Sequence, residues 1–113
     1  MIAEDYCSYE VYKLLKEKGF DGEIHTTFDE EGYTQPSITH QMAMKWLREE
    51  HEIDIIPIIR HSLKYAQESP FRDYACRVYD CDGNIVLSAT KWYSRYENAV
   101  EAALKYCLEK IIK

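Results

Sequence analysis

The last helix predicted in this sequence carries a wide apolar surface, and that surface constrains the fold more than any other feature. Apolar side chains recur there at intervals of three and four residues, which gathers them on one side of a helix. They are Tyr96, Ala99, Val100, Ala103, Leu104, Cys107, Leu108 and Ile111. So wide a stripe must pack broadly, and we expect its partner to be a β-sheet. Ser94 and Glu97 predict a capping box at the start of this helix.

Three strands are predicted before that helix. Residues 53–60 are rich in β-branched side chains, residues 74–80 alternate in polarity, and residues 85–92 follow an Asp82-Gly83 pair. Asp-Gly is typical of a two-residue hairpin turn, because Gly tolerates the positive φ that this turn requires. Pro57 has no amide hydrogen, so the first of these strands is expected at a sheet edge. The three strands should form one antiparallel sheet.

The first 36 residues predict a helix and a strand. The helix is expected over residues 5–18, where Gly19 ends it in a left-handed turn and Phe20 folds back on its last turn. Residues 23–28 alternate in polarity as an exposed strand does, and residues 29–36 combine acids with Gly and Pro as a loop does. This strand either joins the main sheet as a fourth strand or stays apart from it.

The second helix is expected to begin at Thr39. Thr39 is a suitable N-cap, and Ile38 and Ala43 have the spacing of a hydrophobic staple. The sequence therefore predicts a single α+β domain over residues 1–113. Its residues 1–36 form a helix-and-strand extension, and residues 37–113 form an αβββα core with a three-stranded antiparallel sheet covered on one face by helices.

Composition fits a small globular protein and excludes several other classes. The chain has 113 residues with 46% hydrophobic side chains, enough for one core, and a formal net charge of −6. Its longest apolar run, residues 55–59, is too short to span a bilayer, which needs about 20 residues. No basic-then-apolar leader is present at the start, so we expect a cytoplasmic protein with reduced cysteines. Non-specific nucleic-acid binding is disfavoured, since it needs clustered Lys and Arg.

The αβββα order over residues 39–112, with its Asp-Gly hairpin, resembles the double-stranded-RNA-binding domain. The last helix contributes the string Tyr96-Glu97-Asn98-Ala99-Val100-Glu101-Ala102-Ala103-Leu104 to this resemblance. In that family the helix opens with phosphate-binding lysines, whereas here Tyr96 and Glu97 occupy those positions. The family's G-P-x-H loop is matched only at Pro70. The resemblance therefore implies the fold and the Ala-rich packing face without the main phosphate contacts.

Two strings are also similar to small uncharacterised proteins of prophages and mobile elements in gut anaerobic bacteria. They are QMAMKWLREEHEI over residues 41–53 and NAVEAALKYCLEKII over residues 98–112. This second resemblance implies a bacterial cytoplasmic origin, and that family has no assigned activity. It carries over no site, because membership of a family does not by itself define chemistry.

The sequence predicts no catalytic residues, no metal ligands and no cofactor. Its four histidines and four cysteines lack zinc spacing, since Cys76 and Cys81 lie too far apart for a close Cys pair and no two histidines stand at i, i+4. Cys7 and Cys107 fall on apolar helical stripes and are expected in the core, with Cys81 exposed at the hairpin turn. We therefore expect a protein that is not an enzyme.

One set of cationic and aromatic side chains is the candidate interaction surface. It consists of Lys64, Tyr65, Phe71, Arg72, Lys91, Trp92, Tyr93 and Arg95. In an αβββα fold these two segments can lie on neighbouring edges of the sheet. Aromatic side chains anchor protein contacts, and aromatic with cationic side chains also bind nucleic acid. We expect a small binding module that associates with itself or with another protein; the alternative is double-stranded RNA binding through a degenerate face.

Overall fold

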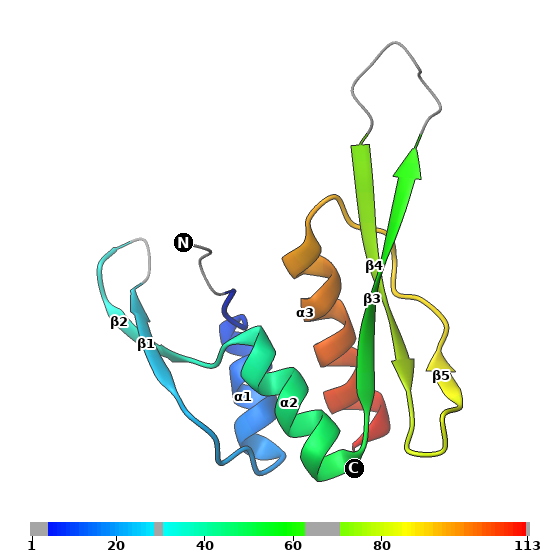
Figure 1. Cartoon of the computed structure of the whole chain (residues 1–113). Coiled ribbons are helices and arrows are strands. Elements are labelled where there is room, and N and C mark those ends of the chain that lie inside the picture. The colour runs from blue at the N-terminus through cyan, green and yellow to red at the C-terminus, as the bar shows by residue number, and fades with distance from the viewer. Residues whose placement is uncertain (1–4, 29–30, 63–70, 113) are drawn as a thin grey trace.

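The computed structural model describes residues 5–28, 31–62 and 71–112, and it confirms an α+β fold. Helices cover one face of a three-stranded sheet, and a separate two-stranded hairpin lies on the far side of α1 and α2 (Figure 1). The elements in chain order are α1 (Tyr9–Glu17), β1 (His25–Phe28), β2 (Thr34–Ser37), α2 (His40–His51), β3 (Asp54–Ser62), β4 (Phe71–Tyr79), β5 (Ile85–Leu87), α3 (Tyr96–Tyr106) and η1 (Cys107–Ile111).

The end of α1 follows the prediction. The amide of Gly19, whose φ is +97°, donates to the carbonyl of Lys16, and the amide of Phe20 donates to the carbonyl of Leu15. This pair of bonds satisfies two carbonyls that a helix end leaves free. Phe20 is buried, so it folds back as expected. The start differs from the prediction, because Ser8 caps the helix and residues 5–8 precede it.

The β1–β2 hairpin corrects the prediction for residues 29–36. They were expected to be a loop, but Thr34 to Ser37 form β2 and pair antiparallel with β1. Pro36 lies opposite Thr26. Both strands of a two-stranded sheet are edge strands, and edge strands tolerate Pro. The hairpin forms its own sheet, so β1 is not a fourth strand of the main one. Phe28 remains 72% exposed at the end of β1.

The start of α2 agrees with the sequence prediction. The hydroxyl of Thr39 accepts a hydrogen bond from the amide of Met42 at 3.2 Å, and the side chains of Ile38 and Ala43 are both fully buried. At its other end Glu52 adopts φ +54°, a left-handed conformation that leads directly into β3. Between these ends α2 packs against α3 and β3.

The main sheet has the strand order β3-β4-β5, so β3 is an edge strand as Pro57 predicted. Pro57 lies opposite Cys76 of β4. The amide and carbonyl of Cys76 both bond to Thr90, on the side away from β3. In an antiparallel pair this makes Pro57 a non-hydrogen-bonded position, so its nitrogen points outward and the sheet loses no bond there.

The turn between β4 and β5 is longer than predicted. The amide of Gly83 donates to the carbonyl of Asp80, and the amide of Asp80 donates to the carbonyl of Asn84, so Cys81, Asp82 and Gly83 form a three-residue loop. Gly83 alone of these has a positive φ, +80°, whereas a two-residue turn of the expected type needs two such residues. The Asp80 carboxylate accepts from the amides of Asp82 and Asn84, which stabilises the longer loop.

The last strand and the start of the last helix also differ from the prediction. β5 ends at Leu87 instead of residue 92, although Thr90 and Tyr93 still bond to the backbone of β4. Arg95 occupies the N-cap of α3, and no side chain caps that helix, so the predicted Ser94 cap is wrong. Arg95 instead contacts Glu97 at 2.7 Å, which directs the Glu97 carboxylate away from the capping position.

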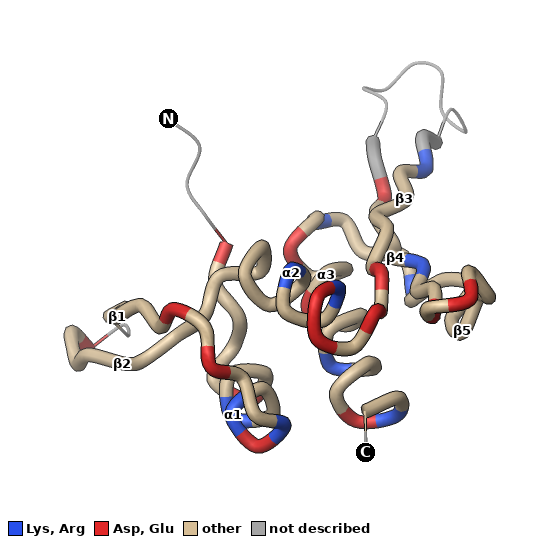
Figure 2. The backbone as a smooth tube through the Cα atoms, turned by 60° about the horizontal axis from the view of Figure 1, so that its bottom comes forward, with Lys and Arg blue, Asp and Glu red and all other residues tan. Residues whose placement is uncertain are grey.

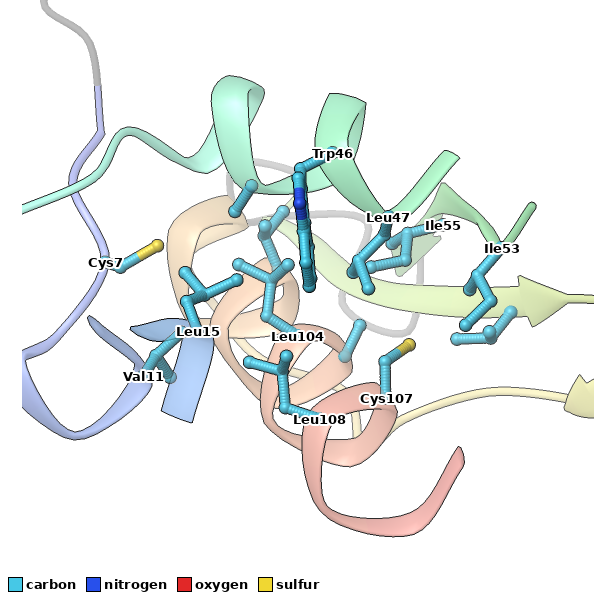
Figure 3. Packing of buried hydrophobic residues seen from close by; sticks show 14 of the residues in the cluster. Cys7, Val11, Leu15, Trp46, Leu47, Ile53, Ile55, Leu104, Cys107 and Leu108 are labelled. Carbon is cyan, nitrogen blue, oxygen red and sulfur yellow. The ribbon is translucent and has the colours of Figure 1, made fainter. Parts of the chain in front are cut away.

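One buried cluster joins α1, α2, α3, η1 and the sheet (Figure 3). As predicted, α3 supplies its small residues Ala99 and Ala103 and its larger residues Val100 and Leu104, all of them buried. Leu15 from α1 packs into the same cluster, so the first 36 residues contribute to the core. Within the described ranges, no helix is long and apolar enough to cross a membrane.

Candidate functional site

A groove of about 510 Å³ runs beside the free edge of β3. Residues of α2, of β3 and of the segment at the start of β1 line it. Apolar side chains from α2 and β3 line it together with cationic ones: Met42, Met44, Lys45, Arg48, Ile55, Ile56 and Pro57. Polar and charged side chains also line it: Glu23, His25, Thr39, Gln41 and Asp54. The groove therefore combines apolar contacts with groups that can hydrogen-bond.

The backbone at this edge is available for pairing. Because Pro57 directs its nitrogen outward, the alternation of an antiparallel strand directs the backbone groups of Ile55 and Ile59 outward as well. No strand among the described residues pairs with this side of β3. The side chains of Ile56 and Ile59 are 48% and 51% exposed. An exposed apolar edge strand is a template for a further strand.

On the sheet face opposite the helices, the Arg60 guanidinium lies 4.3 Å from the centre of the Trp92 ring. Arg60 also donates to the Asp73 carboxylate at 2.7 Å. Exposed contacts of both kinds contribute little individually, about 0.5–1 kcal/mol. They do fix the orientation of the arginine at the end of β3.

The structure places the predicted interaction residues in part. Lys91, Trp92 and Arg95 are exposed, and Tyr93 is half-buried, with its backbone bridged to that of Tyr74 in β4. Lys64 and Tyr65 lie outside the described residues, and Phe71 and Arg72 are described only as the first positions of β4. That these eight residues form one surface stays a prediction.

A second cluster lies where α1, α2 and α3 meet. The Nε2 atom of His40 is 3.0 Å from Oε1 of Glu101, and the amide of Ser8 donates to the same oxygen at 2.7 Å. Cys7 completes the group: one ligand atom from each of Cys7, His40 and Glu101 lies within 4.8 Å of the others. The carbonyl of Cys7 accepts from the hydroxyl of Ser37, which anchors this part of the chain to β2.

The electrostatics of this cluster are set by burial. Burial raises the pKa of the Cys7 thiol, and the Glu101 carboxylate raises it further. Burial also acts to raise the pKa of Glu101, but hydrogen bonds from His40 and Ser8 outweigh it and lower that pKa overall. The cluster therefore holds the ionised carboxylate of Glu101 beside the protonated thiol of Cys7. A protonated thiol is a poor nucleophile, so this arrangement does not favour cysteine catalysis.

No local motif in the sequence encodes this cluster. Cys7 was assigned to the core, where it does lie, and His40 was one of four histidines without zinc spacing. Glu101 was part of an Ala-rich helix. Only the packing of α1 and α2 against α3 brings the three side chains together.

Comparison with known proteins finds no matching family model, no matching curated protein and no matching solved structure. The resemblances to double-stranded-RNA-binding domains and to mobile-element proteins stay predictions.

Proposed function

We propose that this protein is a non-enzymatic binding module that associates with a second copy of itself through β3. The observation that carries the proposal is the free edge of β3, with its exposed isoleucines, beside a groove of mixed apolar and polar lining. Strand addition at such an edge gives affinity through backbone hydrogen bonds, and the groove gives specificity through side chains.

The order of residues along β3 favours a second copy as the partner. Residues 54–60 read Asp-Ile-Ile-Pro-Ile-Ile-Arg, with isoleucines placed symmetrically about Pro57 and opposite charges at Asp54 and Arg60. Two such strands paired antiparallel about Pro57 place every Ile opposite an Ile, and Asp54 of each copy opposite Arg60 of the other. A two-fold interface requires this kind of self-complementarity.

This pairing also accounts for the exposure of Ile59. It lies opposite Tyr74, whose ring contacts Tyr96 of α3, so Ile59 projects on the helix-covered face of the sheet. In the paired arrangement Ile59 of one copy lies opposite Ile55 of the other, beside the groove. The Ile55–Ile59 pairs supply the backbone bonds on either side of Pro57, which has no donor. The two Pro57 rings face each other at the centre, so the strands separate there, no hydrogen bond forms at that position, and the association is weakened to a reversible one.

The test is light scattering coupled to size-exclusion chromatography over a series of concentrations. We expect a concentration-dependent dimer that Ile59→Lys removes. Ile85→Lys is the matched control, because Ile85 is 52% exposed on β5, away from the groove. A chain that stays monomeric at every concentration contradicts the proposal, as does equal loss of the dimer in both variants.

A further inference from the structure

We propose that Cys7, His40 and Glu101 form a binding site for Zn²⁺. The three side chains come from the segment before α1, the first turn of α2 and the middle of α3. They converge within 4.8 Å of one another, with Cys7 and His40 buried and Glu101 half-buried. This site is separate from β3 and independent of the self-association proposed above.

His40 provides the second observation in favour of a ligand. Its side chain is 4% exposed, Nε2 contacts Glu101, and Nδ1 is buried with no hydrogen-bond partner. Nε2 is therefore the ring atom that faces Glu101. Nε2 and Oε1 of Glu101 already lie 3.0 Å apart, close to the separation of two ligand atoms on one Zn²⁺ ion. An ion bound at Nε2, at the Glu101 carboxylate and at the Cys7 sulfur would replace the His40–Glu101 hydrogen bond.

The donor set selects the metal. A thiolate and an imidazole are soft or borderline ligands that suit Zn²⁺ and that Ca²⁺ and Mg²⁺ avoid. Tetrahedral bonds of about 2.0–2.3 Å separate ligand atoms by roughly 3.3–3.8 Å. The three groups therefore need only small side-chain rotations to bind one ion. Three protein ligands leave a fourth position for water, the coordination seen in zinc sites that are open to a further ligand.

The hairpin turn offers the competing site for zinc. Cys81 is exposed there and lies among Asp80, Asp82 and Glu52, whose charges raise the pKa of its thiol. Weak zinc binding to such a surface group is a general property of exposed thiols with acidic neighbours. Cys81→Ser is therefore the control variant, because it removes this group without touching the proposed site.

The experiment titrates the full-length, metal-free protein with Zn²⁺, and with Co²⁺ as a spectroscopic probe. We expect one equivalent of metal to bind and the Co²⁺ complex to show a sulfur-to-cobalt charge-transfer band. Cys81→Ser should keep this band and Cys7→Ser should remove it. Glu101→Gln should weaken Zn²⁺ binding by about 10–100-fold. Binding that survives Cys7→Ser, or that disappears in Cys81→Ser, overturns the proposal.

A measurement on the unmodified protein covers the case in which Cys7→Ser does not fold, as judged by circular dichroism. The imidazole ¹⁵N signals of the histidines report metal binding directly. Addition of Zn²⁺ should shift the Nε2 signal of His40 and leave those of His51, which packs against Trp46, unchanged. Unchanged His40 signals at saturating Zn²⁺ also overturn the proposal.

Discussion

His40 and Glu101 lie 3.0 Å apart, from Nε2 to Oε1, and this contact joins the first turn of α2 to the middle of α3. The amide of Ser8 donates to the same oxygen, so the start of α1 meets both helices there. The carboxylate is the common acceptor of this junction. Its charge state should therefore affect the stability of the whole packing arrangement.

The pH dependence of stability follows from the lowered pKa of Glu101. A carboxyl group whose pKa is lower in the folded state stabilises it above the unfolded value, about 4.3 for Glu, and this contribution is lost as pH falls through the folded value. We expect Glu101→Gln to lower the free energy of unfolding by about 1 kcal/mol at pH 7 and by less at pH 3. Urea denaturation at both pH values measures the difference. An equal loss at pH 7 and pH 3 contradicts this assignment.

Two helix starts give opposite expectations for similar substitutions. Thr39→Ala removes the hydroxyl that accepts from the Met42 amide, and should cost about 1 kcal/mol of stability. Ser94→Ala should change stability by less than about 0.5 kcal/mol, because Ser94 is exposed and makes no capping bond to α3. Thermal or urea denaturation of the two variants checks this contrast. A larger loss for Ser94→Ala would restore the capping box that the sequence suggested.

The packing of α3 on the sheet predicts a severe effect at Ala103, which is fully buried. Ala103→Asp places an unpaired carboxyl in the core and should cost several kcal/mol, out of a typical total of about 5–15 kcal/mol. We expect this variant to be unfolded by circular dichroism. Asn98→Asp is the control, since Asn98 is exposed on the same helix. An unchanged melting temperature for Ala103→Asp would mean that α3 does not dock there.

The account also predicts no strong binding to double-stranded RNA. Tyr96 and Glu97 stand where the RNA-binding family has lysines, and Arg95 is already paired with Glu97. Lys and Arg are interspersed with Asp and Glu along α1 and near the C-terminus (Figure 2). We expect affinity no tighter than about 10⁻⁴–10⁻⁶ M at physiological salt. Submicromolar binding of a duplex with a steep salt dependence would instead support the RNA-binding alternative.

The features that the sequence predicted well are those that a local pattern encodes. Gly19 and Phe20 encode the end of α1, Thr39 encodes the start of α2, and Pro57 encodes the edge position of β3. Each signal acts through a backbone constraint within a few residues. Such backbone constraints do not depend on how distant parts of the chain pack.

The features that the sequence did not predict depend on contacts between distant segments. Pro36 and its acidic neighbours resemble a loop, yet pairing with β1 makes residues 34–37 a strand. Ser94 has capping chemistry, but the bridge between Tyr93 and Tyr74 sets where the chain turns into α3. The cluster of Cys7, His40 and Glu101 exists only because three helices pack together. Tertiary packing decides each of these cases.

The most direct test of self-association through β3 is a charge exchange at Asp54 and Arg60. Asp54→Arg places two arginines opposite each other in the paired strands. Arg60→Asp places two aspartates opposite each other, and it is combined with Asp73→Asn so that no aspartate of the same chain faces residue 60 in β4. Like charges directly opposite are destabilising, so each variant alone should be monomeric by light scattering. In an equimolar mixture each arginine of one chain faces an aspartate of the other, and we expect a heterodimer to form. Monomers in the mixture, or homodimers of either variant as stable as those of the unmodified protein, would contradict the account.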